Sequence, residues 1–266
     1  MKTTLFTVLI TLLFLSSCTD SGDDNPFAPG YDPDGNIFPM EIGNWWKYEN
    51  FDLDSLGKID ESTRTVDSMY VAGSAIKLGE DCKKFNNHID IEGGSSSSDE
   101  IYFRYDGEKV YTLSNMFSMM MPFGDMMLEE EEWIKIVDPN DDVWMVMDLE
   151  DVEFPGFNVA FDMQMTCQKG LSETVVLPNV KECPSDKYIM TAEIEMAFEL
   201  YEGLPPIDVT ITVDITNWYS PGIGLVKMEV GNMQIDAGAF TQVMEEYFDT
   251  MGEVGAVRYL TDYNLN

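Results

Sequence analysis

Short runs of alternating apolar and polar residues follow one another from Phe38 to the C-terminus, and Gly, Pro, Asn and Asp separate them. Alternation with a period of two, rich in β-branched and aromatic residues, is typical of strands that bury one face. The pattern predicts strands at Asn44–Phe51, Arg64–Val71, Lys83–Ile91, Glu100–Tyr105, Lys109–Leu113, Val143–Leu149, Asn158–Cys167, Glu173–Leu177, Tyr188–Leu200, Asp208–Trp218, Gly224–Val230 and Val257–Tyr263. The sequence therefore predicts a mostly β fold, a curved antiparallel sheet or half-barrel.

One segment has helical periodicity instead. Its apolar residues recur at intervals of three and four positions, which places them on one face of a helix. They are Phe240, Val243, Met244, Tyr247, Phe248 and Met251, and Gly252 follows as a C-cap. We expect one or two helices to cover the sheet.

The two halves of the pattern resemble each other. Each contains a Trp-containing strand, then a strand opened by an acidic residue and a cysteine, then a strand that starts at Gly and ends in Asn-Met. These are Asn44–Asp54, Gly79–Ile91 and Gly107–Met116 in one half, and Asp142–Asp151, Val180–Met196 and Gly224–Met233 in the other. The order predicts an internal duplication, with related halves at about residues 37–128 and 129–266.

Three motifs at the ends of this region carry a resemblance. They are FPMEIGNWWKY at Phe38–Tyr48, WYSPGIGLVKME at Trp218–Glu229 and YLTDYNL at Tyr259–Leu265. The pattern resembles one that recurs in uncharacterised Gram-negative lipoproteins and, more distantly, the half-barrels of the Lol-type lipoprotein carriers. That resemblance implies a curved sheet around a hydrophobic cavity covered by helices. The carriers' lipid binding is an analogy at the level of the fold.

The N-terminus has the composition of an export signal. Lys2 precedes an apolar run from Leu5 to Leu15, which is too short for a stable membrane span, and LSSC then ends at Cys18. The motif resembles the lipobox of bacterial lipoproteins. This implies that residues 1–17 are removed as a signal peptide and that Cys18 carries a lipid in an outer-membrane lipoprotein, on the periplasmic or the surface face. The alternative is a plain signal peptide followed by a chance cysteine.

Residues 18–36 lack apolar periodicity and are rich in Asp, Gly and Pro. Such composition predicts a flexible tether between the lipid and a β-rich domain at 37–266.

The charge balance narrows the choice of partners. The chain has 49 acidic and 15 basic residues, a formal net charge of −34. This excess repels polyanions, so we expect no nucleic acid partner and no attraction to anionic lipid surfaces. The membrane is then a partner only through the lipid at Cys18.

Beyond Cys18 the chain has three cysteines, Cys82, Cys167 and Cys183. Export to an oxidising compartment permits a disulfide, and an odd number leaves one thiol over. A strand ending near Thr166 and another starting near Lys187 would be hairpin neighbours, which favours a bridge between Cys167 and Cys183.

Candidates for catalysis and metal binding are weak. His88 is the lone histidine, and it sits in a regular strand alternation without a nucleophile signature. The segment Asp52–Glu61 starts like a calcium loop but lacks the acidic ligand at its twelfth position, so we interpret it as a hairpin turn. Carboxylates are so numerous that their pairing identifies no hydrolase site. We predict no catalytic residue, no metal site and no cofactor.

A methionine-rich stretch precedes Leu128. Thioethers bind Cu(I), but no His or Cys joins the stretch. The other interpretations are a deformable apolar surface for a ligand or partner, or ordinary packing. Together with one face of the predicted helix, the residues of this apolar ligand surface or lid are Met116, Phe117, Met119, Met120, Met121, Phe123, Met126, Met127, Phe240, Met244 and Phe248.

These observations favour a membrane-anchored envelope lipoprotein that binds a hydrophobic ligand or an envelope protein without catalysing a reaction. The alternatives are a hydrolase that uses carboxylates, and a protein that binds copper or calcium.

Overall fold

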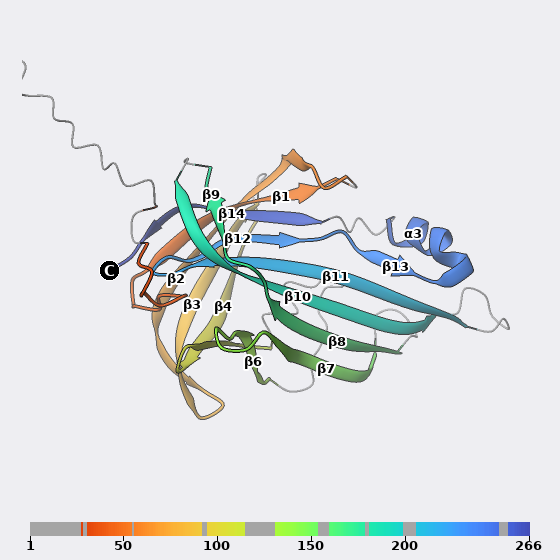
Figure 1. The fold of residues 1–266 in the computed structure, drawn as a ribbon, viewed down its shortest axis with the longest axis horizontal. Coiled ribbons are helices and arrows are strands. Elements are labelled where there is room, and N and C mark those ends of the chain that lie inside the picture. The colour runs from red at the N-terminus through yellow and green to blue at the C-terminus, as the bar shows by residue number, and fades with distance from the viewer. Residues whose placement is uncertain are drawn as a thin grey trace, which may run out of the picture.

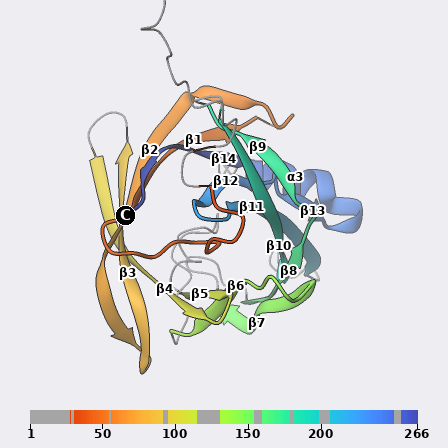
Figure 2. The ribbon, with the colours of Figure 1, turned by 60° about the vertical axis from the view of Figure 1, so that its left-hand side comes forward.

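The computed structural model describes residue 28 and residues 31–54, 56–91, 95–114, 131–153, 160–178, 181–198, 206–249 and 255–266. Within these ranges, fourteen strands form one antiparallel sheet that curls into a nearly closed barrel (Figures 1 and 2). The strands are β1 Trp45–Leu53, β2 Ile59–Lys77, β3 Glu80–Ile91, β4 Ser95–Asp106, β5 Lys109–Leu113, β6 Trp133–Val137, β7 Val143–Glu153, β8 Ala160–Lys169, β9 Glu173–Val176, β10 Glu182–Phe198, β11 Ile207–Ser220, β12 Gly224–Val230, β13 Gln234–Asp236 and β14 Ala256–Asn264. The predicted mostly β fold with a curved antiparallel sheet is confirmed.

The sheet consists of two runs of neighbouring strands, and β1 and β14 pair to join them. Its order is β6-β5-β4-β3-β2-β1-β14-β12-β11-β10-β8-β7. In addition, β9 pairs with β10, and β13 pairs with β11. The two runs meet where β1 pairs with β14, with Trp46 opposite Tyr263. The first run ends with β6, which lies beyond the predicted boundary at residue 128, and the duplication itself stays a prediction.

Alternation along the strands decides which side chains fill the barrel. In β8, Phe161, Met163 and Met165 are buried, whereas Asp162 and Gln164 between them are exposed. Successive side chains of a strand point to opposite faces of the sheet. In β8, one face thus contributes an apolar lining to the barrel, and the other presents polar residues to solvent.

The segment before β1 closes one end of the barrel. In Figure 2 it runs across the barrel opening, and the Phe38 ring lies against Trp46, Phe85, Phe103 and Tyr219, with ring centroids 5.1 to 6.2 Å apart. Large aromatic side chains bury the most apolar area per residue. Phe38 therefore acts as a plug that ties strands of both halves together.

Residues assigned to the tether take part in this closure. The Ala28 N–H donates to the Glu182 carbonyl at 2.9 Å, and the Asp32 N–H donates to the Pro221 carbonyl at 3.2 Å. The Gly222 N–H donates to the Asn36 carbonyl at 2.9 Å. The folded body therefore begins before residue 37, the boundary that composition indicated, because backbone contacts hold these polar residues in place.

The turn after β11 lies directly against the plug. Trp46 Nε1 donates to the Ile223 carbonyl at 2.7 Å, and a Cβ on Gly224 would lie 3.0 Å from Cδ2 of Phe38. The C-terminus joins them, since the Asn266 N–H donates to Oδ1 of the fully buried Asn44 at 2.8 Å. The three motifs that carry the resemblance thus meet in space.

A single short helix is present in the part of the chain that the structure describes, α3 at Thr241–Asp249, preceded by a 3₁₀ turn at Gly238–Phe240. It packs beside β13 at one end of the sheet (Figure 1) and does not lie across the sheet. The predicted helix is present, but it lies at one end of the sheet, whereas we expected it to cover a face of the sheet.

Substitution of Gly224 tests the plug. Gly224 has a φ of +104° and no room for a Cβ beside Phe38, so Gly224→Ala should lower the free energy of unfolding by about 3 kcal/mol. Gly107 has a φ of +64° and open space around it, so Gly107→Ala should cost about 1 kcal/mol. Urea unfolding monitored by tryptophan fluorescence measures both. Equal losses would show that the close contact with Phe38 is unimportant.

Candidate functional site

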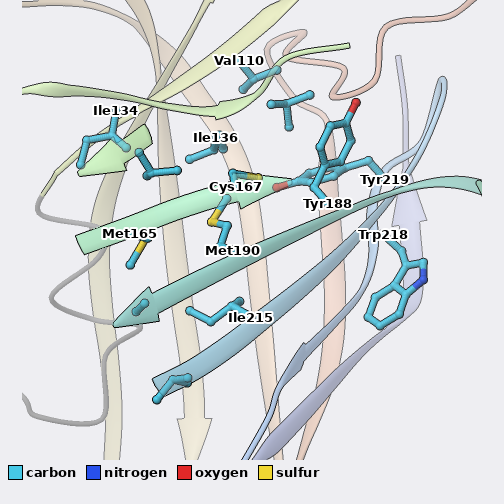
Figure 3. Close-up of a cluster of buried hydrophobic side chains, with 14 of the residues drawn as sticks. Val110, Ile134, Ile136, Met165, Cys167, Tyr188, Met190, Ile215, Trp218 and Tyr219 are labelled. Atoms are coloured by element: carbon cyan, nitrogen blue, oxygen red, sulfur yellow. The ribbon is translucent and has the colours of Figure 1, made fainter. Parts of the chain in front are cut away.

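The strands β8, β10 and β11 form an inner wall that is part of the main apolar core. Its inward side chains are buried, and sulfur-containing ones are frequent among them. Figure 3 shows Met165, Cys167, Met190 and Ile215 projecting from these strands toward the same interior. Methionine adapts to irregular shapes because its side chain is unbranched and polarizable. This wall is chemically suited to contact apolar groups of variable shape.

A pocket of about 430 Å³ opens where this wall ends. Phe161, Met196 and Val209 lie side by side there on neighbouring strands. The other lining residues are Asp151, Ala160, Asp162, Glu195, Ala197, Asp208 and Thr210. The pocket is open to solvent, and polar groups make up more of its lining than apolar groups do. The pocket thus combines an apolar row with an acidic margin.

A buried ion pair stands on the inner wall near the β1–β14 junction. Arg258 Nη2 lies 3.1 Å from Oδ2 of Asp67, and the guanidinium stacks 3.9 Å from the ring centre of Tyr48. Burial raises the pKa of the Tyr48 hydroxyl above its ordinary range, Arg258 opposes this effect, and Asp67 adds to it. Tyr48 is therefore neutral, and its hydroxyl donates to the Leu225 carbonyl at 3.2 Å.

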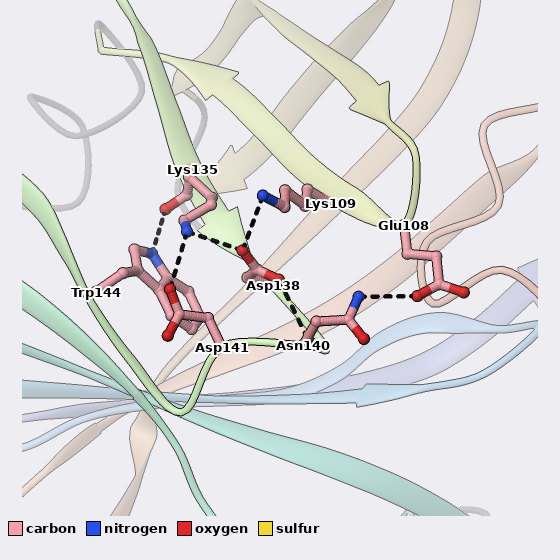
Figure 4. A network of polar contacts seen from close by, with 7 residues as sticks. All are labelled: Glu108, Lys109, Lys135, Asp138, Asn140, Asp141 and Trp144. Atoms are coloured by element: carbon pink, nitrogen blue, oxygen red, sulfur yellow. Dashed lines mark hydrogen bonds and ion pairs between the residues drawn. The ribbon is translucent and has the colours of Figure 1, made fainter.

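A second polar cluster holds the two free edges of the sheet together (Figure 4). Trp144 Nε1 of β7 donates to the Lys135 carbonyl of β6 at 2.9 Å. Asp138, in the connection between these strands, lies 2.8 Å from Nζ of Lys135 and 3.4 Å from Nζ of Lys109. Side chains rather than a backbone ladder thus join the barrel at this seam.

Asp138 is the centre of that cluster, and its carboxyl group is buried. Burial raises the pKa of Asp138, but the hydrogen bond and charge of Lys135, the Asn140 N–H and the charge of Lys109 outweigh burial and lower it below the ordinary value. Asp138 is therefore ionised at neutral pH and satisfied by its neighbours. The role of the cluster is structural, because its charged and polar groups pair with one another.

The predicted disulfide is not formed. Strands β8 and β10 are neighbours, as expected, but the register places Cys167 opposite Met190 and Cys183 opposite Val175 of β9. Seven positions of extended strand, about 23 Å, separate Met190 from Cys183, far beyond disulfide reach. Cys82, Cys167 and Cys183 are buried free thiols, and burial raises the pKa of the latter two to about 12.

The weaker candidates are explained by local structure. His88 lies on β3 with its Nε2 atom 3.1 Å from Oδ1 of Asp90. In the calcium-like segment, Oδ1 of Asp54 accepts hydrogen bonds from the N–H groups of Leu56 and Lys58, which forms a hairpin turn. Among the described residues, no group of three or more His, Cys, Asp or Glu side chains is arranged to hold a metal ion.

The predicted apolar lid is described in part. Cys18 and the residues from Met116 to Met127 lie outside the described residues. In the helical part, Met244 is fully buried, Phe240 is 46% exposed, and Phe248 belongs to α3 with its side chain outside the description. The role of these residues in ligand binding stays a prediction.

The sequence matches no protein-family model and no curated protein. Two solved structures are similar in fold. One is a chain described as a "putative lipoprotein" from Parabacteroides distasonis ATCC 8503, with 14% identity, a TM-score of 0.48, and coverage of 86% of this chain and 99% of that one. The other, a "putative exported protein with YmcC-like fold" from Bacteroides fragilis NCTC 9343, has 14% identity, a TM-score of 0.44, and coverage of 87% and 100%.

None of the helices described has the length and apolar character required to cross a membrane.

The sequence interpretation missed the polar residues of the inner wall. Arg258, Asp67 and Asn87 look like ordinary polar positions of alternating strands. The signal that identifies Arg258 is parity, because it is two positions from the apolar Leu260 and on the same side of the strand. The pairing of β1 and β14 is regular from Tyr48 to Asp52, so this parity holds in the structure.

Asp138→Asn tests the seam cluster. At pH 7 we expect a loss of about 2 kcal/mol in the free energy of unfolding, less than for a fully buried pair because Lys109 and Lys135 reach solvent. Because the folded pKa of Asp138 is lowered, its contribution is present above the unfolded value, about pH 3.9, and disappears as the pH falls through the folded value. The difference between wild type and variant should therefore shrink at pH 3.

The matched control is Asp141→Asn. Its carboxylate lies 3.6 Å from Nζ of Lys135 and is 49% exposed, so the loss should stay below about 0.5 kcal/mol. Urea unfolding at pH 7 and pH 3 measures both variants. A pH-independent difference for Asp138→Asn would contradict the assigned role of its charge.

Proposed function

We propose that this protein is a lipid-anchored envelope protein whose barrel binds a hydrophobic ligand. The observation that carries the proposal is the inner wall of β8, β10 and β11, on which Met163, Met165, Met190 and Met196 are buried side by side with aliphatic residues. A wall of this composition can repack around an apolar ligand at low cost, since each methionine has several accessible rotamers.

The pocket supports an entry for such a ligand at one end of the wall. The pocket is lined by the apolar side chains of Phe161, Met196 and Val209, which face inward at the ends of their strands. The opposite end is closed by the Phe38 plug and its aromatic neighbours. An apolar ligand would therefore enter from the pocket side and lie along the strands.

The sequence supports attachment to the envelope through lipid rather than charge. The formal net charge of −34 opposes adsorption of the folded body to anionic lipid surfaces. The apolar run and LSSC motif that precede Cys18 provide an alternative means of attachment. Multiple acyl chains anchor a protein stably, whereas one does not. We therefore assign the protein to the cell envelope as an outer-membrane lipoprotein.

Cys18→Ala tests the anchor. Cells that express the full chain and are fed an alkyne-labelled fatty acid should label the wild type and not the variant, and the variant should leave the membrane fraction. Cys82→Ala is the control, because Cys82 lies in β3 of the folded body and should leave labelling intact. Labelling of the Cys18→Ala protein would disprove lipidation at this position.

A residue exchange across the sheet tests ligand binding. On β8, Met165 faces inward and Gln164 faces outward. Met165→Gln therefore places an amide on the inner face, and Gln164→Met places a thioether on the outer face. With an apolar dye that fluoresces when it leaves water, Met165→Gln should weaken binding by about tenfold, since placing an amide on the wall costs at least 1.4 kcal/mol. Gln164→Met should bind as the wild type does. No dye binding by the wild type would contradict the proposed function.

A further inference from the structure

A group of polar side chains projects from the inner wall where β14, β1, β2 and β3 run side by side. Asp67 of β2 is directly opposite Tyr48, and Arg258 of β14 is directly opposite Asn50, two positions further along β1. Asn87 of β3 is opposite Met69, which shares the inward face with Asp67. Strand pairing therefore places Asp67 between the other two on the inward face, with Arg258 level with Asn50 of β1 and Asn87 level with Trp46.

Asp67 and Asn87 are buried, Arg258 is half-buried, and all three are incompletely paired. Asp67 is 6% exposed and Asn87 is 7% exposed. Arg258 and Asp67 form an ion pair at 3.1 Å, yet the contact lacks the alignment of a hydrogen bond. Oδ1 of Asp67, Oδ1 of Asn87 and Nε of Arg258 likewise have no hydrogen-bond partner within the described ranges. Buried polar atoms are satisfied in the great majority of cases, so this concentration indicates a site for an external partner.

The unpaired atoms specify the chemistry of that partner. The guanidinium of Arg258 offers N–H donors in a planar arrangement that suits phosphate or carboxylate oxygens. The two Oδ1 atoms are acceptors and require a donor. Arg258 and Asp67 together carry no net charge, so an anion would meet the repulsion of Asp67 and a cation that of Arg258. The complement is a neutral zwitterion.

We propose that Arg258, Asp67 and Asn87 bind a zwitterionic headgroup that joins a phosphate to an amine, as in phosphatidylethanolamine. The phosphate oxygens accept from Arg258, and the ammonium donates to Oδ1 of Asp67 and Oδ1 of Asn87. This inference rests on the proposed function, because it assigns the acyl chains of the same ligand to the methionine wall.

The two parts of the site lie on one continuous face. Arg258 is opposite Met228 of β12, and Met228 is opposite Asn217 of β11. From Asn217 the inward residues of β11 are apolar as far as Val209 at the pocket, which is about 26 Å of extended strand. A headgroup held at Arg258 therefore has an apolar surface beside it along which chains can extend.

The test uses the mature lipoprotein, purified in non-ionic detergent and stripped of lipid. It is incubated with vesicles of equal parts phosphatidylethanolamine and phosphatidylglycerol with identical acyl chains, and the retained lipids are measured by mass spectrometry. We expect phosphatidylethanolamine to exceed phosphatidylglycerol by about tenfold, the effect of one hydrogen bond between charged groups.

Asn87→Leu isolates the headgroup contact. It removes an acceptor that has no partner among the residues described, so folding stability should be unchanged or higher, while the preference for phosphatidylethanolamine should fall toward equality. Asn86→Leu is the matched control on the opposite face of β3, where Nδ2 of Asn86 donates to the Tyr70 hydroxyl, and it should keep the preference. A preference that survives Asn87→Leu would overturn the assignment.

Other outcomes separate the headgroup site from the proposed function. Equal retention of both lipids by the wild type would overturn the headgroup site and leave hydrophobic binding in place. Retention of neither lipid would overturn both. Free phosphoethanolamine that binds as tightly as the lipid, measured by calorimetry, would support the headgroup site and overturn the role of the apolar wall.

Discussion

The fold depends on the contact between Phe38 and the aromatic side chains at one end of the barrel. One end of the barrel is filled by an aromatic side chain that no strand of the sheet supplies. Phe38 provides it from outside the sheet, and the turn at Gly224 and the C-terminal Asn266 lie against the same region. Because β1 and β14 come from opposite ends of the chain, closure requires long-range contacts before the barrel exists.

The two places where the barrel closes differ in kind. At the β1–β14 junction a backbone ladder joins the halves, whereas at the β6–β7 seam the bonds come from Trp144, Lys135 and Asp138. In a backbone ladder the stabilising free energy is spread over many hydrogen bonds. At the seam it comes from a few side chains, including the buried carboxylate of Asp138. A single substitution at the seam therefore removes a larger share of the local contacts than one in the ladder does.

Polar residues inside the barrel have two distinct roles. Asp138 is matched by lysines and a backbone N–H, so its charge supports the structure. Asp67, Asn87 and Arg258 keep atoms that have no hydrogen-bond partner in the described part of the chain. Unpaired buried groups reduce stability unless something else satisfies them. This difference in hydrogen bonding is the reason that we assign a ligand to the second group and not to the first.

The sequence by itself determined the β class, the inward parity of β8, β10 and β11, and the helix near Met244, because each depends on local periodicity. It did not determine that the serines of Ser95–Ser98 extend β4, since strand pairing overrides their weak preference for a strand. Only the tertiary structure decided that Cys167 faces Met190, that residues 31–36 are docked, and that Arg258 meets Asp67. These features depend on register and bulges, which long-range pairing sets and local sequence does not encode.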